Sequence, residues 1–198
     1  MSTLCKSNAR QMALALRIYV ADAGGFPGAT MFGQFWFDCL APYLANAKWG
    51  QGVLKCPGYK CQLSLRSGAP GGSYAYNSAG THNILDASGV ALRQTGLGGI
   101  NFGQDFRPWF RPVRESDVKV PADMYALGDA PVDYWDDLNL TMGEIEFGAM
   151  NDKAAKNVAH SRIFNMAFVD GHVESVRTNI LFGWETSYLR RWNTDHEP

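Results

Sequence analysis

Apolar residues at the start of the chain recur at spacings of three and four, which predicts an amphipathic helix over residues 3–21. Gly24 and Gly25 are expected to end this helix, and Pro27 prevents it from resuming. The residues that share the apolar face are Cys5, Ala9, Met12, Ala13, Leu16, Tyr19 and Val20. We therefore expect one core helix at the beginning of the chain.

Beyond this helix the pattern changes to short apolar segments separated by Gly, Pro and Ser, which favours strands and turns. Residues 35–48 are an exception and predict a second, short helix. A short strand is expected around residues 73–77 and a buried strand over residues 124–129. Residues 96–117 alternate Gly, Pro and aromatic residues, which predicts an ordered surface loop.

The clearest local signal lies near the end of the chain, where residues 163–177 predict a β-hairpin. Asp170 and Gly171 match the preferred two-residue type I′ turn, and in this register Phe168 lies opposite Val173. The hairpin is expected to contribute an apolar face to the sheet that holds the N-terminal helix. A helix packed on antiparallel strands predicts an α+β fold.

The composition is typical of a globular protein, with 198 residues of which 46% are hydrophobic and 19% are charged. Since the sequence contains no linker or repeat, we expect one domain over residues 1–198. Its helix lies in residues 1–24, and a loop-rich β-sheet head occupies residues 25–198. The net charge of −1 disfavours nucleic acid as a partner. The sequence predicts no membrane span and no secretory signal of its own.

The four cysteines are Cys5, Cys39, Cys56 and Cys61, and their even number is compatible with two disulfides in any of three pairings. A local bridge between Cys56 and Cys61 would close a small loop. The Cys-x4-Cys spacing lacks a second close pair of Cys or His, which makes zinc a weaker prediction than disulfides or buried free thiols.

His160 stands nine residues before Asp170-Gly171. This spacing resembles the prepilin-type processing-associated domain, which is defined by His, nine residues and Asp-Gly and occurs in pseudopilin-like envelope proteins. Other segments run in the order expected for that family, so the resemblance covers nearly the whole chain. These segments are residues 5–22, 36–44, 56–57, 73–77, 121–129 and 192–196.

The resemblance implies a pilin-like fold and a structural, non-catalytic subunit of a type II secretion pseudopilus or a type IV pilus-like apparatus. The implied partners are other pilin-like subunits, the secretion machinery and the prepilin peptidase that cleaves the full-length precursor. In this family a leader and an apolar helix precede the head, and we expect both to be missing from this sequence. That helix would anchor the full-length protein in the inner membrane, with the head in the periplasm or outside the cell.

The motif residues are expected to have structural roles. If residues 160–170 were fully extended, His160 and Asp170 would lie roughly 33 Å apart and could not share a metal ion. Asp170 and Gly171 both suit a turn. His160 is expected to tether the entrance of the strand to a neighbouring loop, such as the loop after Asp129.

An acidic segment offers candidate calcium ligands, because Asp133, Asp136, Asp137 and Asn139 crowd oxygen atoms into one short stretch. Some pseudopilins bind calcium in a loop near the sheet, which adds to this expectation. The spacing is not that of an EF-hand, so a solvated acidic loop is the competing interpretation. Apart from this candidate Ca²⁺, we expect no cofactor.

Enzyme motifs are absent from the sequence, which contains no Gly-x-Ser-x-Gly and no Gly-Lys-Ser/Thr after its glycine-rich residues 96–99. Glu144, Glu146 and Asp129 would offer carboxylates to a glycosidase, but no other feature marks such a site. We therefore predict no enzyme.

An alternative function is an extracellular module that binds carbohydrate or another ligand through loop aromatics. The candidate stacking residues are Trp109, Phe110, Trp135 and Trp184. Core packing is the competing interpretation of the same aromatic residues.

Overall fold

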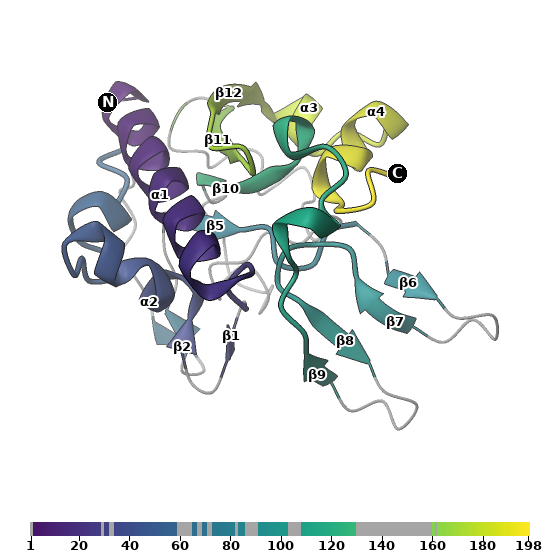
Figure 1. The fold of residues 1–198 in the computed structure, drawn as a ribbon. Helices are drawn as coiled ribbons and strands as arrows, with labels where there is room; N and C mark the ends of the chain where they lie inside the picture. Colours follow the sequence, from purple (N-terminus) through teal and green to yellow (C-terminus); the bar gives the residue numbers. More distant parts are fainter. Residues whose placement is uncertain are drawn as a thin grey trace.

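The fold is mixed α and β, in agreement with the predicted α+β class (Figure 1). A computed structural model describes residues 2–28, 30–31, 34–58, 65–66, 69–70, 73–81, 83–85, 91–102, 108–129, 160 and 162–198. None of the helices in these ranges is long and apolar enough to cross a membrane.

The first helix, α1, runs from Ser2 to Ala23 and buries one face completely. Six of the seven residues predicted for that face are at most 7% exposed, and Tyr19 is partly buried. The helix ends where predicted, because Gly24 adopts a φ of +76° and its N–H donates to the carbonyl of Val20. The apolar periodicity therefore identified both the helix and the face that it buries.

The sheet beneath α1 has four antiparallel strands in the order β12-β11-β10-β5. These strands are β5 (Tyr74–Tyr76), β10 (Tyr125–Asp129), β11 (Ile163–Phe168) and β12 (Val173–Arg177). Alternate side chains of the sheet pack on α1, and the others pack on the C-terminal segment. The sheet is therefore the middle layer between the N-terminal helix and the end of the chain (Figure 1).

The predicted hairpin forms, but its register and its turn differ from the prediction. Val173 lies opposite Ala167 rather than Phe168. Of the two turn residues, only Gly171 has a positive φ, at +96°, so the turn is not type I′. The N–H of Gly171 donates to the carbonyl of Phe168, which matches a longer loop that ends in a left-handed glycine.

The large apolar side chains of the hairpin face away from α1, contrary to the simplest expectation. Phe164, Met166 and Phe168 pack against Leu181 and Trp192. On the other face, the small side chains of Ala167 and Val169 belong to the core beneath the helix. Small side chains on this face allow α1 to pack close to the strand, and the larger side chains fill the core on the opposite side.

The C-terminal segment covers that opposite side with short helices. These are α3 (Thr178–Leu181), α4 (Thr186–Leu189) and the 3-10 turn Arg190–Trp192. Trp192 is completely buried, and its indole N–H donates to the carbonyl of Leu181 at 3.0 Å. Its ring meets the ring of Tyr125 edge-on at 5.4 Å between centroids.

The second predicted helix is shorter than expected. Helix α2 spans Trp36–Leu40 and continues only as the 3-10 turn Ala41–Leu44, which contains Pro42. Ala45 and Asn46 then adopt positive φ values of 51° and 57°, which end the helical path. A further 3-10 turn, Gly52–Leu54, leads to Cys56.

The surface loop predicted for residues 96–117 is wrong, because this segment contributes two strands to a second four-stranded antiparallel sheet. That sheet consists of β6 (Asn83–Leu85), β7 (Ala91–Gln94), β8 (Ile100–Phe102) and β9 (Pro108–Phe110). Two-stranded pairs are formed by β1 (Thr30–Met31) with β2 (Gln34–Phe35), and by β3 (Leu65–Arg66) with β4 (Ala69–Pro70). Two 3-10 turns, Glu115–Asp117 and Pro121–Asp123, precede β10.

Candidate functional site

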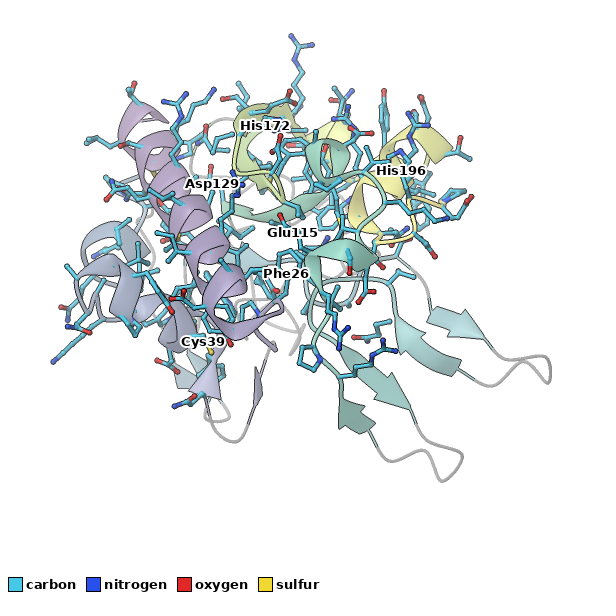
Figure 2. All side chains as sticks on the ribbon, in the orientation of Figure 1. Phe26, Cys39, Glu115, Asp129, His172 and His196 are labelled. Carbon is cyan, nitrogen blue, oxygen red and sulfur yellow. A yellow bond between two sulfur atoms is a disulfide. The ribbon has the colours of Figure 1, made fainter. Side chains whose placement is uncertain are left out.

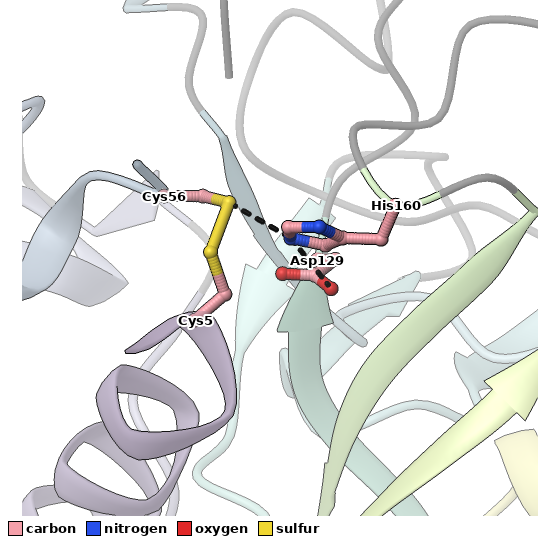
Figure 3. A group of neighbouring side chains, drawn as sticks. All are labelled: Cys5, Cys56, Asp129 and His160. Carbon is pink, nitrogen blue, oxygen red and sulfur yellow. Dashed lines mark hydrogen bonds and ion pairs between the residues drawn. A yellow bond between two sulfur atoms is a disulfide. The ribbon is translucent and has the colours of Figure 1, made fainter. Parts of the chain in front are cut away.

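Four chemically reactive side chains meet beside the first turns of α1, namely Cys5, Cys56, Asp129 and His160 (Figure 3). One donor atom from each residue lies within 4.8 Å of all the others. Cys5 lies on α1, and Cys56 lies just after the 3-10 turn Gly52–Leu54. Asp129 ends β10, and His160 lies in the turn before β11. The group therefore joins four segments that are far apart in sequence.

Cys5 and Cys56 form a disulfide that closes a loop with a sequence separation of 51. Their Cα atoms are 5.2 Å apart, within the usual range for a disulfide. The N–H of Cys56 donates to the hydroxyl of Ser73 at 2.7 Å, which holds this segment against the start of β5. Because Cys56 is paired with Cys5, the local bridge to Cys61 does not form, and Cys61 lies outside the described residues.

Cys39 is a free thiol on α2, apart from this group (Figure 2). Its side chain is half-buried near Tyr19. Burial raises the pKa of the Cys39 thiol and raises the pKa of Tyr19 to about 12. A raised pKa disfavours the thiolate, which is the reactive form of cysteine.

Asp129 is the buried acid of the site, with 2% of its surface exposed. Its Oδ2 accepts hydrogen bonds from the backbone N–H and the side-chain amide of Asn165, both at 2.8 Å. The absence of a side chain at Gly128 lets β10 lie close to β11 here, since a Cβ at Gly128 would lie 2.6 Å from the carbonyl oxygen of Asn165. Burial raises the pKa of Asp129, and among the described residues its Oδ1 has no hydrogen-bond partner.

His160 presents one ring nitrogen to both the disulfide and the acid. Its Nε2 lies 3.1 Å from Sγ of Cys56 and 3.9 Å from Oδ2 of Asp129. A Cys-His-Asp catalytic triad instead directs one ring nitrogen to the thiol and the other to the carboxylate. The arrangement is thus not that of a nucleophilic triad, and the sulfur of Cys56 is already bonded to Cys5.

Asp170 and Gly171, the other half of the motif, lie in the hairpin turn and contact α1 at a different point. Oδ1 of Asp170 accepts the N–H of His172 at 3.0 Å and contacts Nδ1 of the same residue at 2.6 Å. Arg17 on α1 donates from Nη1 to the carbonyl oxygen of Asp170 at 2.9 Å. The turn is therefore docked on the helix through its backbone.

The two ends of the motif fasten β11 to two points on α1. At one end, His160 contacts Cys56, which is bonded to Cys5 of α1. At the other end, the carbonyl oxygen of Asp170 accepts a hydrogen bond from Arg17 of α1. Cys5 and Arg17 are twelve positions apart in α1, which corresponds to about 18 Å along the helix axis. The segment from His160 to Asp170 is not fully extended, because Arg162 has a φ of +69° and Asp170 lies in the hairpin turn.

Replacing Gly171 with alanine is expected to lower the free energy of unfolding by about 2 kcal/mol. A side chain at φ +96° is disfavoured, and its Cβ would lie 3.0 Å from Cδ of Arg17. Gly24→Ala is the matched control, because Gly24 has a φ of +76° but an added Cβ would meet nothing within 4 Å beyond its chain neighbours. Urea unfolding of both variants checks this, and an equal or smaller loss for Gly171→Ala would refute the docking argument.

Several candidate residues fall where the structure says nothing of their side chains. The candidate calcium ligands Asp133, Asp136, Asp137 and Asn139 lie outside the described residues, as does Trp135. Trp109 and Phe110 belong to β9, but their side chains are not among those described. Trp184 is 77% exposed after α3. The calcium and ligand-stacking hypotheses therefore stay predictions.

Sequence reasoning missed the buried polar residues that connect the layers. Asn77 follows β5 and is completely buried. Its side-chain amide donates to the carbonyls of Tyr125 and Trp192, both at 2.8 Å, and its Oδ1 accepts the N–H of Gly80. Asn165 supports Asp129 in a similar way. In the sequence, each of these amides stands beside apolar or aromatic residues of a strand. That position could have indicated a buried amide, which needs hydrogen-bond partners within the protein.

The fold and this group of side chains define an α+β protein in which a disulfide joins the N-terminal helix to the segment at Cys56, beside a buried His-Asp pair at the edge of the sheet. Comparisons with protein-family models, with curated proteins and with solved structures gave no match.

Proposed function

We propose that this chain is the head of a pilin-like subunit of the cell envelope, which assembles with similar subunits and does not catalyse a reaction. The observation that carries this proposal is the two-sided nature of α1. One face is buried on the antiparallel sheet, while the opposite face exposes Leu4, Leu14 and Ile18 at 60%, 61% and 41%. An exposed apolar face on an otherwise well-packed helix is typical of an interaction surface.

The spacing of the exposed residues supports a helix as the partner. Leu4, Ser7, Gln11, Leu14 and Ile18 are all exposed and follow one another at intervals of three, four, three and four. This is the spacing of a helix-packing seam. We infer that the seam faces the α1 helix of a neighbouring subunit, as the family resemblance implies for a filament of packed helices.

The disulfide fits the proposed location of the head in the periplasm or outside the cell, because disulfides persist in oxidising compartments. The proposed partners are other pilin-like subunits and the secretion machinery. Prepilin peptidase would act on the full-length precursor, whose preceding apolar helix would provide the membrane anchor. In this proposal, the His-x9-Asp-Gly motif is structural and joins the hairpin to α1.

A photo-crosslinking amino acid at Leu14 in the full-length protein, expressed in its native cells, is expected to yield adducts with pilin-like subunits in the envelope fraction. The matched control carries the same probe at Ser187, an exposed residue of α4. Adducts identified by mass spectrometry at Leu14 but not at Ser187 would support the proposal. Equal labelling at the two positions, or no envelope adduct, would contradict it.

The gene sequence upstream of codon 1 provides an independent check. The proposal expects a short leader that ends in Gly, followed by about 20 predominantly apolar residues. A full-length gene product without such a segment would remove the membrane anchor and with it the pilin-like assignment.

A further inference from the structure

We propose that the reduced protein binds a zinc ion through Cys5, Cys56, Asp129 and His160, at the place that the disulfide occupies in the oxidised protein. The four donor atoms lie within 4.8 Å of one another. Cys5, Cys56 and Asp129 are at most 2% exposed, and 5% of the side chain of His160 is exposed. The inference is independent of the proposed assembly function.

The donor set matches zinc in number and in kind. Two thiolates, one imidazole and one carboxylate provide four ligands for tetrahedral Zn²⁺, and thiolates disfavour magnesium and calcium. At a Zn–S distance of about 2.3 Å, tetrahedral geometry places the two sulfur atoms about 3.8 Å apart. Once the bridge opens, side-chain rotation of Cys5 and Cys56 can provide this separation. Nε2 of His160 already faces Cys56 at 3.1 Å (Figure 3).

An unpartnered oxygen provides a second observation that points to a ligand. Oδ1 of Asp129 is buried and accepts no hydrogen bond from the described residues. A buried carboxylate oxygen without a partner is costly unless a cation or a donor satisfies it. The other oxygen, Oδ2, is held by Asn165, whose own Oδ1 accepts the hydroxyl of Ser175 at 3.1 Å. Such outer contacts orient the ligands of a metal site.

The disulfide and the zinc site exclude each other, because both use the same two sulfur atoms. Opening the bridge consumes two electrons and two protons, which a dithiol reductant supplies as it is itself oxidised to a disulfide. Binding of Zn²⁺ then releases the two thiol protons to solvent. Each state joins the start of α1 to the segment at Cys56, and zinc would add direct bonds to β10 and to the entrance of β11.

The site was hard to find from sequence because its ligands do not form two close pairs. The separation is 51 residues between Cys5 and Cys56, and 104 between Cys56 and His160. The usual zinc patterns rely on short spacings within each pair. Here the tertiary fold brings together four single ligands.

The experiment titrates Co²⁺ and then Zn²⁺ into the protein after reduction with a phosphine, which takes up an oxygen atom from water as it reduces the disulfide. We expect one equivalent of Co²⁺ to produce thiolate charge-transfer and tetrahedral d–d bands, and Zn²⁺ to displace it. The oxidised protein should show neither band. Circular dichroism, recorded in parallel, reports whether the reduced chain is folded before and after the metal is added.

Three variants make the assignment specific. His160→Ala and Asp129→Asn should each weaken Zn²⁺ binding at least tenfold, whereas Cys39→Ser should leave it unchanged. If the reduced chain unfolds, recovery of the native spectrum on addition of Zn²⁺ in wild type, but not in His160→Ala, supports the site equally well. Absence of the cobalt bands in reduced wild type, or equal affinity in wild type and His160→Ala, would overturn the proposal.

Discussion

Replacing Cys5 and Cys56 together with serine is expected to lower the free energy of unfolding of the oxidised protein by about 4 kcal/mol. The bridge joins residues with a sequence separation of 51, so it removes much of the conformational freedom of the unfolded chain. It also holds the first turns of α1 beside the core. Urea unfolding in the presence of a metal chelator and without reductant measures the difference.

The control for this experiment is Cys39→Ser, which removes a half-buried free thiol and leaves the bridge intact. We expect that change to cost no more than about 1 kcal/mol. Wild-type protein in reductant and chelator should unfold at nearly the same urea concentration as the double variant. If the double variant and Cys39→Ser unfold at the same midpoint, the bridge does not stabilise the fold.

Asn77→Asp is expected to destabilise the protein by about 3 to 5 kcal/mol at neutral pH. The substitution replaces the amide that donates to the carbonyls of Tyr125 and Trp192 with a buried negative charge. Those two carbonyls belong to β10 and to the C-terminal segment, so the change weakens the contact between two layers. Thermal or urea unfolding measures the effect.

The same substitution at Asn179, which is exposed on α3, is the matched control and should change the stability by less than about 0.5 kcal/mol. Burial should raise the pKa of the new carboxyl in the folded state. The folded Asn77→Asp protein then binds a proton more tightly than the unfolded chain, so its deficit should shrink as the pH falls and grow as the pH rises. A deficit that does not depend on pH would contradict burial of the charge.

The stability experiments and the zinc titration separate two roles of the same cysteines. In the oxidised protein, the bridge joins the start of α1 to the segment at Cys56, and His160 and Asp129 form a buried polar contact beside it. In the reduced protein, the same four residues would hold a metal ion. The redox conditions of the compartment would thus decide which of the two links joins these elements.

Elements whose pattern is local could be predicted from the amino-acid sequence. The buried face of α1 follows from apolar residues three and four positions apart, and the strands of the hairpin follow from β-forming residues around Asp170-Gly171. Such patterns report neighbours within one turn of helix or along one strand. The register predicted for the hairpin was wrong, and the local patterns did not reveal the second sheet, because strand pairing depends on contacts beyond the pattern of one strand.

Contacts between residues far apart in the chain became visible only in the folded protein. The pairing of Cys5 with Cys56, the contact of His160 with Cys56 and the support of Asp129 by Asn165 join residues 51, 104 and 36 positions apart. The motif spacing was visible in sequence, but its role in fastening β11 to two points on α1 was not. Each of these contacts forms only when segments far apart in the chain pack together and exclude water from the side chains between them.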